Sequence, residues 1–176
     1  MKTLFDPTTA PIDALAAEPP LPTERLNPEW LRDRFRQPVD WTPEFTDEHV
    51  LRDTQRVPVP ASVLMPLVVR ENQISLLLTQ RTAHLHDHAG QISLPGGRVD
   101  SDDYDAVATA LRETEEEIGL SRRHIEVIGT LPDYFTGTGF QVTPVVGLVY
   151  PPFELAADEF EVAEIFEVPL HLLMDG

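Results

Sequence analysis

Residues 94–120 read LPGGRVDSDDYDAVATALRETEEEIGL, and this stretch decides the fold. Apolar and small side chains recur in it at helical spacing, which predicts a helix over residues 105–118 with one buried face. Asp102 or Asp103 could cap the start of this helix. Gly119 could end it, because glycine readily adopts the left-handed conformation that follows many helices.

Three glutamates share one side of the predicted helix: Glu113, Glu116 and Glu117. They lie beside the buried face, because successive helical residues turn by about 100°. Negative charge is unfavourable there, since the carboxyl end of a helix is already negative and Glu113 repels Glu117 by about 0.2–0.5 kcal/mol. A cation would resolve the conflict, because carboxylates at this spacing can converge on a hard ion. The pattern therefore favours a site for Mg²⁺ or Mn²⁺ over a solvated acidic face.

The stretch resembles the Nudix box, whose usual form is G-x5-E-x7-R-E-U-x-E-E-x-G-U, where U is a bulky apolar residue. Gly97 matches its first position, and residues 112–120 supply the core REx2EExGL. The resemblance implies an α/β fold: the Nudix-type α/β/α sandwich with a mixed sheet and a loop-helix-loop catalytic motif.

The chain departs from the box in its early part. The interval from Gly97 to Arg112 is one residue longer than usual, and Tyr104 stands where the early glutamate would be. Aspartates at positions 102, 103 and 105 lie nearby and could supply an acidic group.

A second motif lies directly upstream, where residues 77–97 read LLTQRTAHLHDHAGQISLPGG. It resembles LLTxR[SA]x3Rx3Gx3FPGG, the motif of the coenzyme A pyrophosphatase branch of the Nudix family. LLT, Arg81, the next glycine and PGG match in register, whereas Thr82, His86 and Leu94 differ. A neutral His86 would bind a phosphate less strongly than the arginine of the branch.

The resemblance implies roles for individual residues. As metal ligands it implies the backbone carbonyl of Gly96 and the side chains of Glu113, Glu116 and Glu117. Arg112 is expected to orient these carboxylates, and Glu116 or Glu161 to take a proton from the attacking water. The expected substrate contacts are Arg81, His86, Tyr134 and Phe135. Arg81 could instead pair with a carboxylate, and the two aromatic residues could instead fill the core.

The expected reaction is hydrolysis of the pyrophosphate bond of coenzyme A or acyl-coenzyme A, assisted by Mg²⁺ or Mn²⁺. Its products would be 3′,5′-ADP and 4′-phosphopantetheine or the acyl form of the latter. One alternative is hydrolysis of another nucleoside diphosphate derivative, such as NADH, ADP-ribose or a damaged nucleotide. The other is a non-catalytic nucleotide-binding regulatory domain.

Composition limits the classes of partner. The 176 residues carry 30 acidic and 13 basic side chains, a net charge of −17, so nonspecific binding to nucleic acid is not expected. No apolar run reaches transmembrane length and the first residues do not resemble a secretory signal, so no membrane association is expected. The absence of cysteine excludes disulfides and fits a cytoplasmic protein. The expected partner is a small nucleotide-type substrate, and a homodimer is left open.

The chain divides into two expected parts. Residues 1–58 are proline-rich and should form an N-terminal arm with a short helix over residues 29–37 that packs on the domain, and residues 59–176 should form the Nudix domain. Strands are expected over residues 61–69, 74–79, 125–131 and 142–150, a helix or loop over residues 161–166, and a short helix over residues 170–174. The branch usually continues with a further strand and helix, so a shortened form or a fragment is expected.

Overall fold

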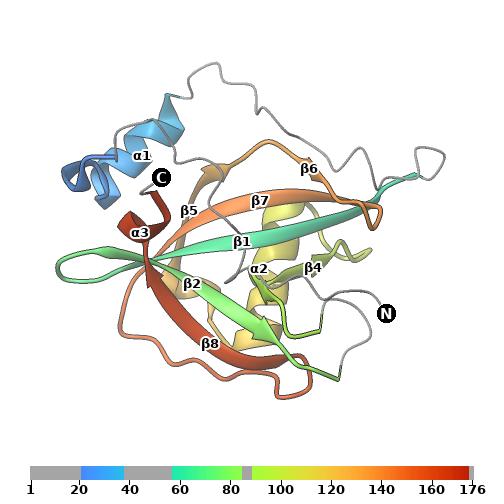
Figure 1. The fold of residues 1–176 in the computed structure, drawn as a ribbon. Helices are drawn as coiled ribbons and strands as arrows, with labels where there is room; N and C mark the ends of the chain where they lie inside the picture. The colour runs from blue at the N-terminus through green and yellow to red at the C-terminus, as the bar shows by residue number, and fades with distance from the viewer. Residues whose placement is uncertain (1–20, 38–56, 85–88, 175–176) are drawn as a thin grey trace, which may run out of the picture.

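The computed structural model describes residues 21–37, 57–84 and 89–174, which form an eight-stranded mixed sheet with helices (Figure 1). The strands are β1 Val59–Val69, β2 Ile74–Arg81, β3 Ile92–Ser93, β4 Gly96–Arg98, β5 Ile125–Thr130, β6 Tyr134–Phe135, β7 Phe140–Val149 and β8 Val162–Pro169. The helices are α1 Pro28–Arg36, α2 Ala106–Ile118 and α3 Leu170–Met174, with 3₁₀ turns η2 Thr23–Arg25 and η3 Arg122–His124. Most of the predicted N-terminal arm lies outside the described residues.

The central strand of the sheet is β1, which runs parallel to β7 and antiparallel to β2. This arrangement confirms the predicted mixed sheet. β1 pairs with β2 only over residues 67–69, whereas its residues 61–63 pair with β4. Since the other edge of β1 is taken by β7, β4 fills the gap where β1 and β2 separate.

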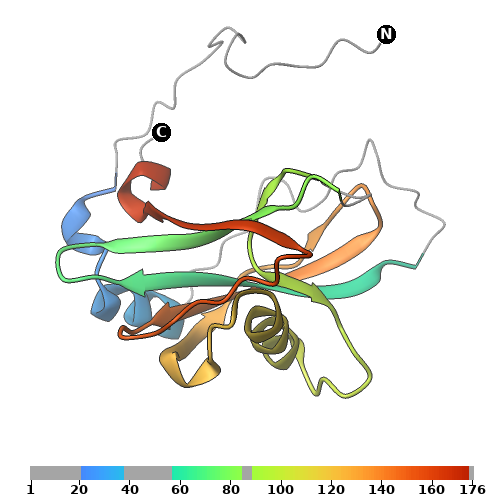
Figure 2. The same ribbon diagram turned by 90° about the horizontal axis from the view of Figure 1, so that it is seen from below.

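Alternate residues of the central strands face opposite sides of the sheet. In β1, Leu64 and Val68 face α2, whereas Leu67 packs with Leu31 of α1 and Leu170 of α3. Figure 2 shows α2 on one side of the sheet and α3 on the other. The predicted α/β/α sandwich is therefore confirmed.

The ends of α2 follow from its capping residues. Asp105 caps the start, because its Oδ1 accepts a hydrogen bond from the Ala108 N–H over 2.7 Å. The prediction that Asp102 or Asp103 caps the helix is wrong, since both precede the cap and the Asp103 carboxylate pairs with Arg112 instead. Gly119 ends the helix at a φ of 68°, as predicted.

Ile118 tests the packing of α2 on the sheet. It is fully buried against Val68, Leu77 and Val149. We expect Ile118→Ala to lower the free energy of unfolding by about 2–5 kcal/mol, because it leaves a cavity that neighbouring side chains fill only in part. Urea unfolding measures this change. The control Ile92→Ala, at a side chain that is 61% exposed, should change the free energy by less than about 0.5 kcal/mol, and equal effects at both positions would contradict this packing.

The helix predicted after Asn27 is confirmed as α1. The Asn27 side chain accepts a hydrogen bond from the Trp30 N–H over 2.9 Å, as expected of a capping residue. Leu31 is buried between α1 and the sheet, and Arg32 forms a two-point ion pair with Glu126 of β5 at 2.7 and 2.8 Å. These contacts hold α1 against the sheet.

The helix or loop predicted over residues 161–166 is wrong, because this segment begins β8. β8 pairs with β2 from Arg81 opposite Val162 to Ser75 opposite Pro169. Pairing with a distant strand thus outweighs the local acidic composition. The short helix after β8 is confirmed as α3. Within the described part of the chain, no helix combines the length and hydropathy needed to cross a membrane.

Candidate metal and active site

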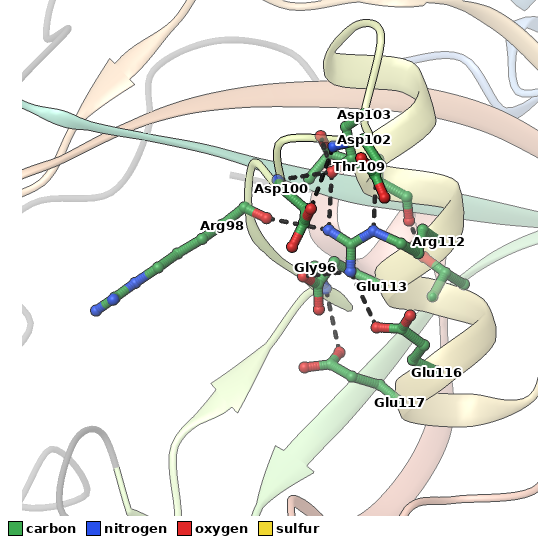
Figure 3. A network of polar contacts seen from close by, with 12 residues as sticks. Gly96, Arg98, Asp100, Asp102, Asp103, Thr109, Arg112, Glu113, Glu116 and Glu117 are labelled. Atoms are coloured by element: carbon green, nitrogen blue, oxygen red, sulfur yellow. Dashed lines mark hydrogen bonds and ion pairs between the residues drawn. The ribbon is translucent and has the colours of Figure 1, made fainter.

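The predicted site residues that the structure describes come from α2, β4, the end of β2 and the turn before β8, and two further ones, Tyr134 and Phe135, come from β6. β4 lies beside α2, and Figure 3 shows Glu116 and Glu117 projecting from α2 on the side of Gly96. The Gly96 N–H donates a hydrogen bond to Glu117 Oε2 over 3.1 Å. Within the predicted loop-helix-loop motif, the strand that precedes α2 thus lies against the glutamates of α2.

Glu117 and Glu113 are carboxylates held largely away from solvent. Glu117 is 7% exposed, and its burial raises its pKa to about 7, with a further contribution from the negative charges of Glu161 and Glu113. Burial also raises the pKa of Glu113, although the hydrogen bond from Arg112 opposes the rise. Two neighbouring carboxylates with raised pKa values form a site that a cation would stabilise.

Glu116 is the exposed member of the three glutamates, with a side chain that is 60% exposed. Arg112 Nη1 lies 2.9 Å from Glu116 Oε2 and 2.9 Å from Glu113 Oε1. The guanidinium therefore contacts one oxygen of each carboxylate and leaves the second oxygen of each for another ligand. This geometry suits the orienting role predicted for Arg112.

Asp103 is the acidic residue that the structure selects from the three aspartates near the missing glutamate. Its side chain is 6% exposed and lies 2.8 Å from Arg112 Nη2, whereas Tyr104 is 82% exposed. The sequence contains a signal for this choice. The extra residue between Gly97 and Arg112 shifts the acidic residue one position further from Arg112. Sequence reasoning missed Thr109, a buried residue whose hydroxyl lies 2.9 Å from Asp103 Oδ2.

Gly97 allows β4 to approach the glutamates closely. A Cβ atom built on Gly97 would lie 2.6 Å from each carboxylate oxygen of Glu113, a distance too short for any side chain. A glycine therefore lets the Glu113 carboxylate lie against the backbone of β4, and a larger residue here would displace that carboxylate.

Arg81 is a cationic residue near the glutamates, and it belongs to the upstream motif of residues 77–97. It lies at the end of β2, and its positive charge opposes the rise in the pKa of Glu117. Its Nε is buried and has no hydrogen-bond partner among the residues that the structure describes. Buried polar atoms are seldom left without a partner, so this nitrogen is available to an acceptor on a ligand. His86, the other predicted contact in this segment, lies outside the described residues.

Glu161 reaches the site from the turn before β8. Its carbonyl oxygen accepts a hydrogen bond from the Thr82 N–H over 2.9 Å, which holds this turn to the residue after β2. Its negative charge raises the pKa of both Glu113 and Glu117. The structure thus brings Glu161 into the same electrostatic environment as the glutamates of α2.

Tyr134 and Phe135 lie in β6, across the sheet from β4. Tyr134 is in register with Val142 of β7, which is in register with Ala61 of β1, and Ala61 is in register with Arg98. At about 4.8 Å for each strand, the backbone of β6 is about 14 Å from that of β4. The register thus separates the backbone of β6 from that of β4, and the substrate contact of these aromatic residues stays a prediction.

The donor set suits a hard divalent cation. Among residues 21–37, 57–84 and 89–174, no three acidic or histidine side chains already converge closely enough to hold a metal ion. Glu113 nevertheless lies close enough to Glu117 to contribute to its raised pKa, and the exposed Glu116 side chain can rotate toward them. Carboxylate oxygens on successive turns, with a backbone carbonyl at Gly96, are the ligand type that Mg²⁺ and Mn²⁺ prefer.

Comparison with known proteins agrees with this geometry. The family model of the NUDIX domain matches residues 58–173. The chain is 53% identical over 110 residues to the uncharacterized Nudix hydrolase NudL of Escherichia coli K12, a match that covers 62% of this chain and 57% of NudL. The chain thus spans little more than half the length of this curated relative.

Solved structures share the fold at lower identity. The Nudix hydrolase RenU of M. smegmatis superposes with a TM-score of 0.54 at 23% identity, covering 64% of this chain and 71% of RenU. The NUDIX domain of Shewanella oneidensis NrtR, solved in complex with ADP ribose, has a TM-score of 0.51 at 21% identity, covering 69% of this chain and 80% of that domain.

Proposed function

This chain belongs to the Nudix family, and from that premise we propose that it hydrolyses the pyrophosphate bond of coenzyme A or acyl-coenzyme A. The observation that carries the proposal is the group of carboxylates around the buried Glu117, whose pKa is raised to about 7. Such a group is unfavourable in a protein that binds no cation, and it suits one that binds Mg²⁺ or Mn²⁺ together with a diphosphate.

The proposed roles of the residues follow from their positions. Glu113, Glu116 and Glu117 would hold the cation, with the Gly96 carbonyl as a further ligand. Bound Mg²⁺ or Mn²⁺ would neutralise the diphosphate and make water a better nucleophile. Glu116 or Glu161 would take the proton of the attacking water. Glu116 suits this role because its side chain is exposed. Glu161 suits it because it lies close enough to Glu113 and Glu117 for its negative charge to raise the pKa of both.

Two observations support coenzyme A as the substrate. The segment LLTQR to PGG, residues 77–97, resembles the branch that cleaves coenzyme A. Its Arg81 has a buried Nε without a partner among the described residues, beside carboxylates that would bind the cations of a diphosphate complex. An arginine in this position could donate to a phosphate oxygen of the substrate. We propose that the predicted contacts of His86, Tyr134 and Phe135 involve other parts of the same molecule.

A second candidate substrate is ADP-ribose or a related nucleoside diphosphate derivative such as NADH. His86, which stands where the coenzyme A branch has arginine, favours this alternative because a neutral imidazole adds no charge for a phosphate. The ADP ribose complex of the NrtR domain, which shares this fold, also supports it.

Product analysis with a substrate panel tests both candidates. The full chain is incubated with Mg²⁺ or Mn²⁺ and with coenzyme A, NADH, ADP-ribose or nucleoside triphosphates, and the products are identified by mass. We expect coenzyme A to yield 3′,5′-ADP and 4′-phosphopantetheine, and chelation by EDTA to stop the reaction. Cleavage of NADH or ADP-ribose alone would favour the second candidate. Tight binding without turnover of any substrate would contradict a hydrolase and support a regulatory domain.

A further inference from the structure

Arg112 uses every one of its hydrogen-bond donors. A guanidinium has five N–H groups. Nε donates to Asp103 Oδ1 over 3.0 Å, and Nη2 donates to Asp103 Oδ2 over 2.8 Å and to the Arg98 carbonyl over 3.1 Å. Nη1 donates to Glu113 Oε1 and Glu116 Oε2, each over 2.9 Å. The Arg112 guanidinium is therefore held by Asp103 on one side and holds the carboxylates of Glu113 and Glu116 on the other (Figure 3).

The Asp103 carboxylate is itself held in place by the loop and by α2. Its Oδ2 accepts a hydrogen bond from the Asp100 N–H over 2.9 Å and lies 2.9 Å from the Thr109 hydroxyl. The Asp103 N–H in turn donates to the Asp100 carbonyl over 3.1 Å, which closes a tight turn. Arg112 also holds the pKa of Asp103 below its ordinary range, so this carboxyl is ionised at neutral pH.

We propose that Asp103 is a positioning residue, which fixes Arg112 so that the carboxylates of Glu113 and Glu116 are presented to the metal. It takes this place because the turn at residues 100–103 accommodates the extra residue of the loop, while Tyr104 points to solvent. The inference rests on the proposed metal role of these glutamates. Without Asp103, two Arg112 donors would lose their partners, and the guanidinium could turn away from the glutamates.

Mn²⁺ binding to the full chain tests this role without relying on turnover. The dissociation constant is measured by the electron paramagnetic resonance of free Mn²⁺, at a temperature well below unfolding. We expect Asp103→Asn to raise it by about 10-fold, which is typical of the loss of a group that orients metal ligands. The control Asp102→Asn makes the same chemical change one residue away, at an exposed side chain, and should stay within about twofold of the unmodified protein.

A double-variant cycle tests whether Asp103 acts through Arg112. In an Arg112→Lys background, adding Asp103→Asn should raise the dissociation constant by less than about twofold, because the guanidinium that Asp103 positions is already gone. If the two effects multiply, or if Asp103→Asn binds Mn²⁺ as tightly as Asp102→Asn, the proposal is overturned.

A second variant covers the case in which Asp103→Asn does not fold. Thr109→Val replaces the hydroxyl beside Asp103 with a methyl group. It should raise the dissociation constant by about threefold, less than the roughly 10–100-fold typical of groups that bond metal ligands directly, because Thr109 acts one contact further away. No change in Mn²⁺ affinity in this variant would count against the proposal. Failure of the unmodified protein to bind Mn²⁺ would instead reject the proposed function, so the two failures are distinct.

Discussion

Replacing Glu117 with glutamine is expected to lower kcat by at least about 100-fold while raising the midpoint of thermal unfolding in EDTA by about 2–4 °C. Glutamine keeps the size of the side chain and an oxygen that can accept the Gly96 N–H. It removes a buried negative charge that is repelled by Glu113 and Glu161. At pH 8, where Glu117 is ionised in the native state, the uncharged variant should therefore be more stable without metal.

Two measurements on one preparation check this prediction. Steady-state kinetics with saturating Mg²⁺ gives kcat, and calorimetry in EDTA gives the unfolding midpoint. The control Glu115→Gln changes the neighbouring glutamate, which pairs with Arg122 rather than with the site, and it should keep kcat within about twofold. A Glu117→Gln variant that kept full activity would remove this residue from the metal site. One that lost stability in EDTA would show that the charge is compensated in the native state.

Gly97→Ala is expected to lower kcat/KM by about 100-fold, since an ångström-scale displacement of a catalytic group can have an effect of this size. The added methyl group would lie 2.6 Å from the Glu113 carboxylate oxygens, so the carboxylate must move away from β4. The effect should appear in Mn²⁺ affinity as well as in kcat/KM. Circular dichroism and the unfolding midpoint establish that the variant retains its fold.

Gly90→Ala is a control for the loss of a glycine away from Glu113. A methyl group added there meets no atom within 4 Å, whereas the φ of 72° strains an alanine by about 1–2 kcal/mol, so the unfolding midpoint should fall while kcat/KM stays within about threefold of the unmodified protein. If Gly97→Ala were as active as Gly90→Ala, the close approach of β4 to Glu113 would have no part in the reaction.

The sequence was most informative where neighbours along one helix decide the geometry. The shared side of Glu113, Glu116 and Glu117 and the end of α2 at Gly119 follow from helical spacing and from glycine conformation. The fold class was predicted in the same way, from apolar periodicity and from a family resemblance. The predicted roles of the site residues stay predictions, although the contacts of Arg112 suit the one assigned to it.

Features that depend on the path of a loop or on a distant strand could not be predicted. Three neighbouring aspartates have similar local propensities, and only the turn at residues 100–103 directs Asp103 inward and leaves Asp105 as the cap. The strand at β8 depends on the edge of β2, more than 80 residues earlier, because Val162 pairs with Arg81. The acidic segment itself contains no pattern that predicts pairing with β2.

The parallel pairing of β1 with β7 has a consequence for synthesis on the ribosome. These strands are in register from Val59 opposite Phe140 to Val68 opposite Val149, so a long stretch of the chain, from residue 70 to residue 139, separates them. A nascent chain that has released β1, β2 and α2 still lacks the strand that covers the remaining edge of β1. That edge carries unpaired backbone groups beside apolar side chains, which favour association with other chains. The interval before β7 emerges is thus when this protein is most exposed to aggregation.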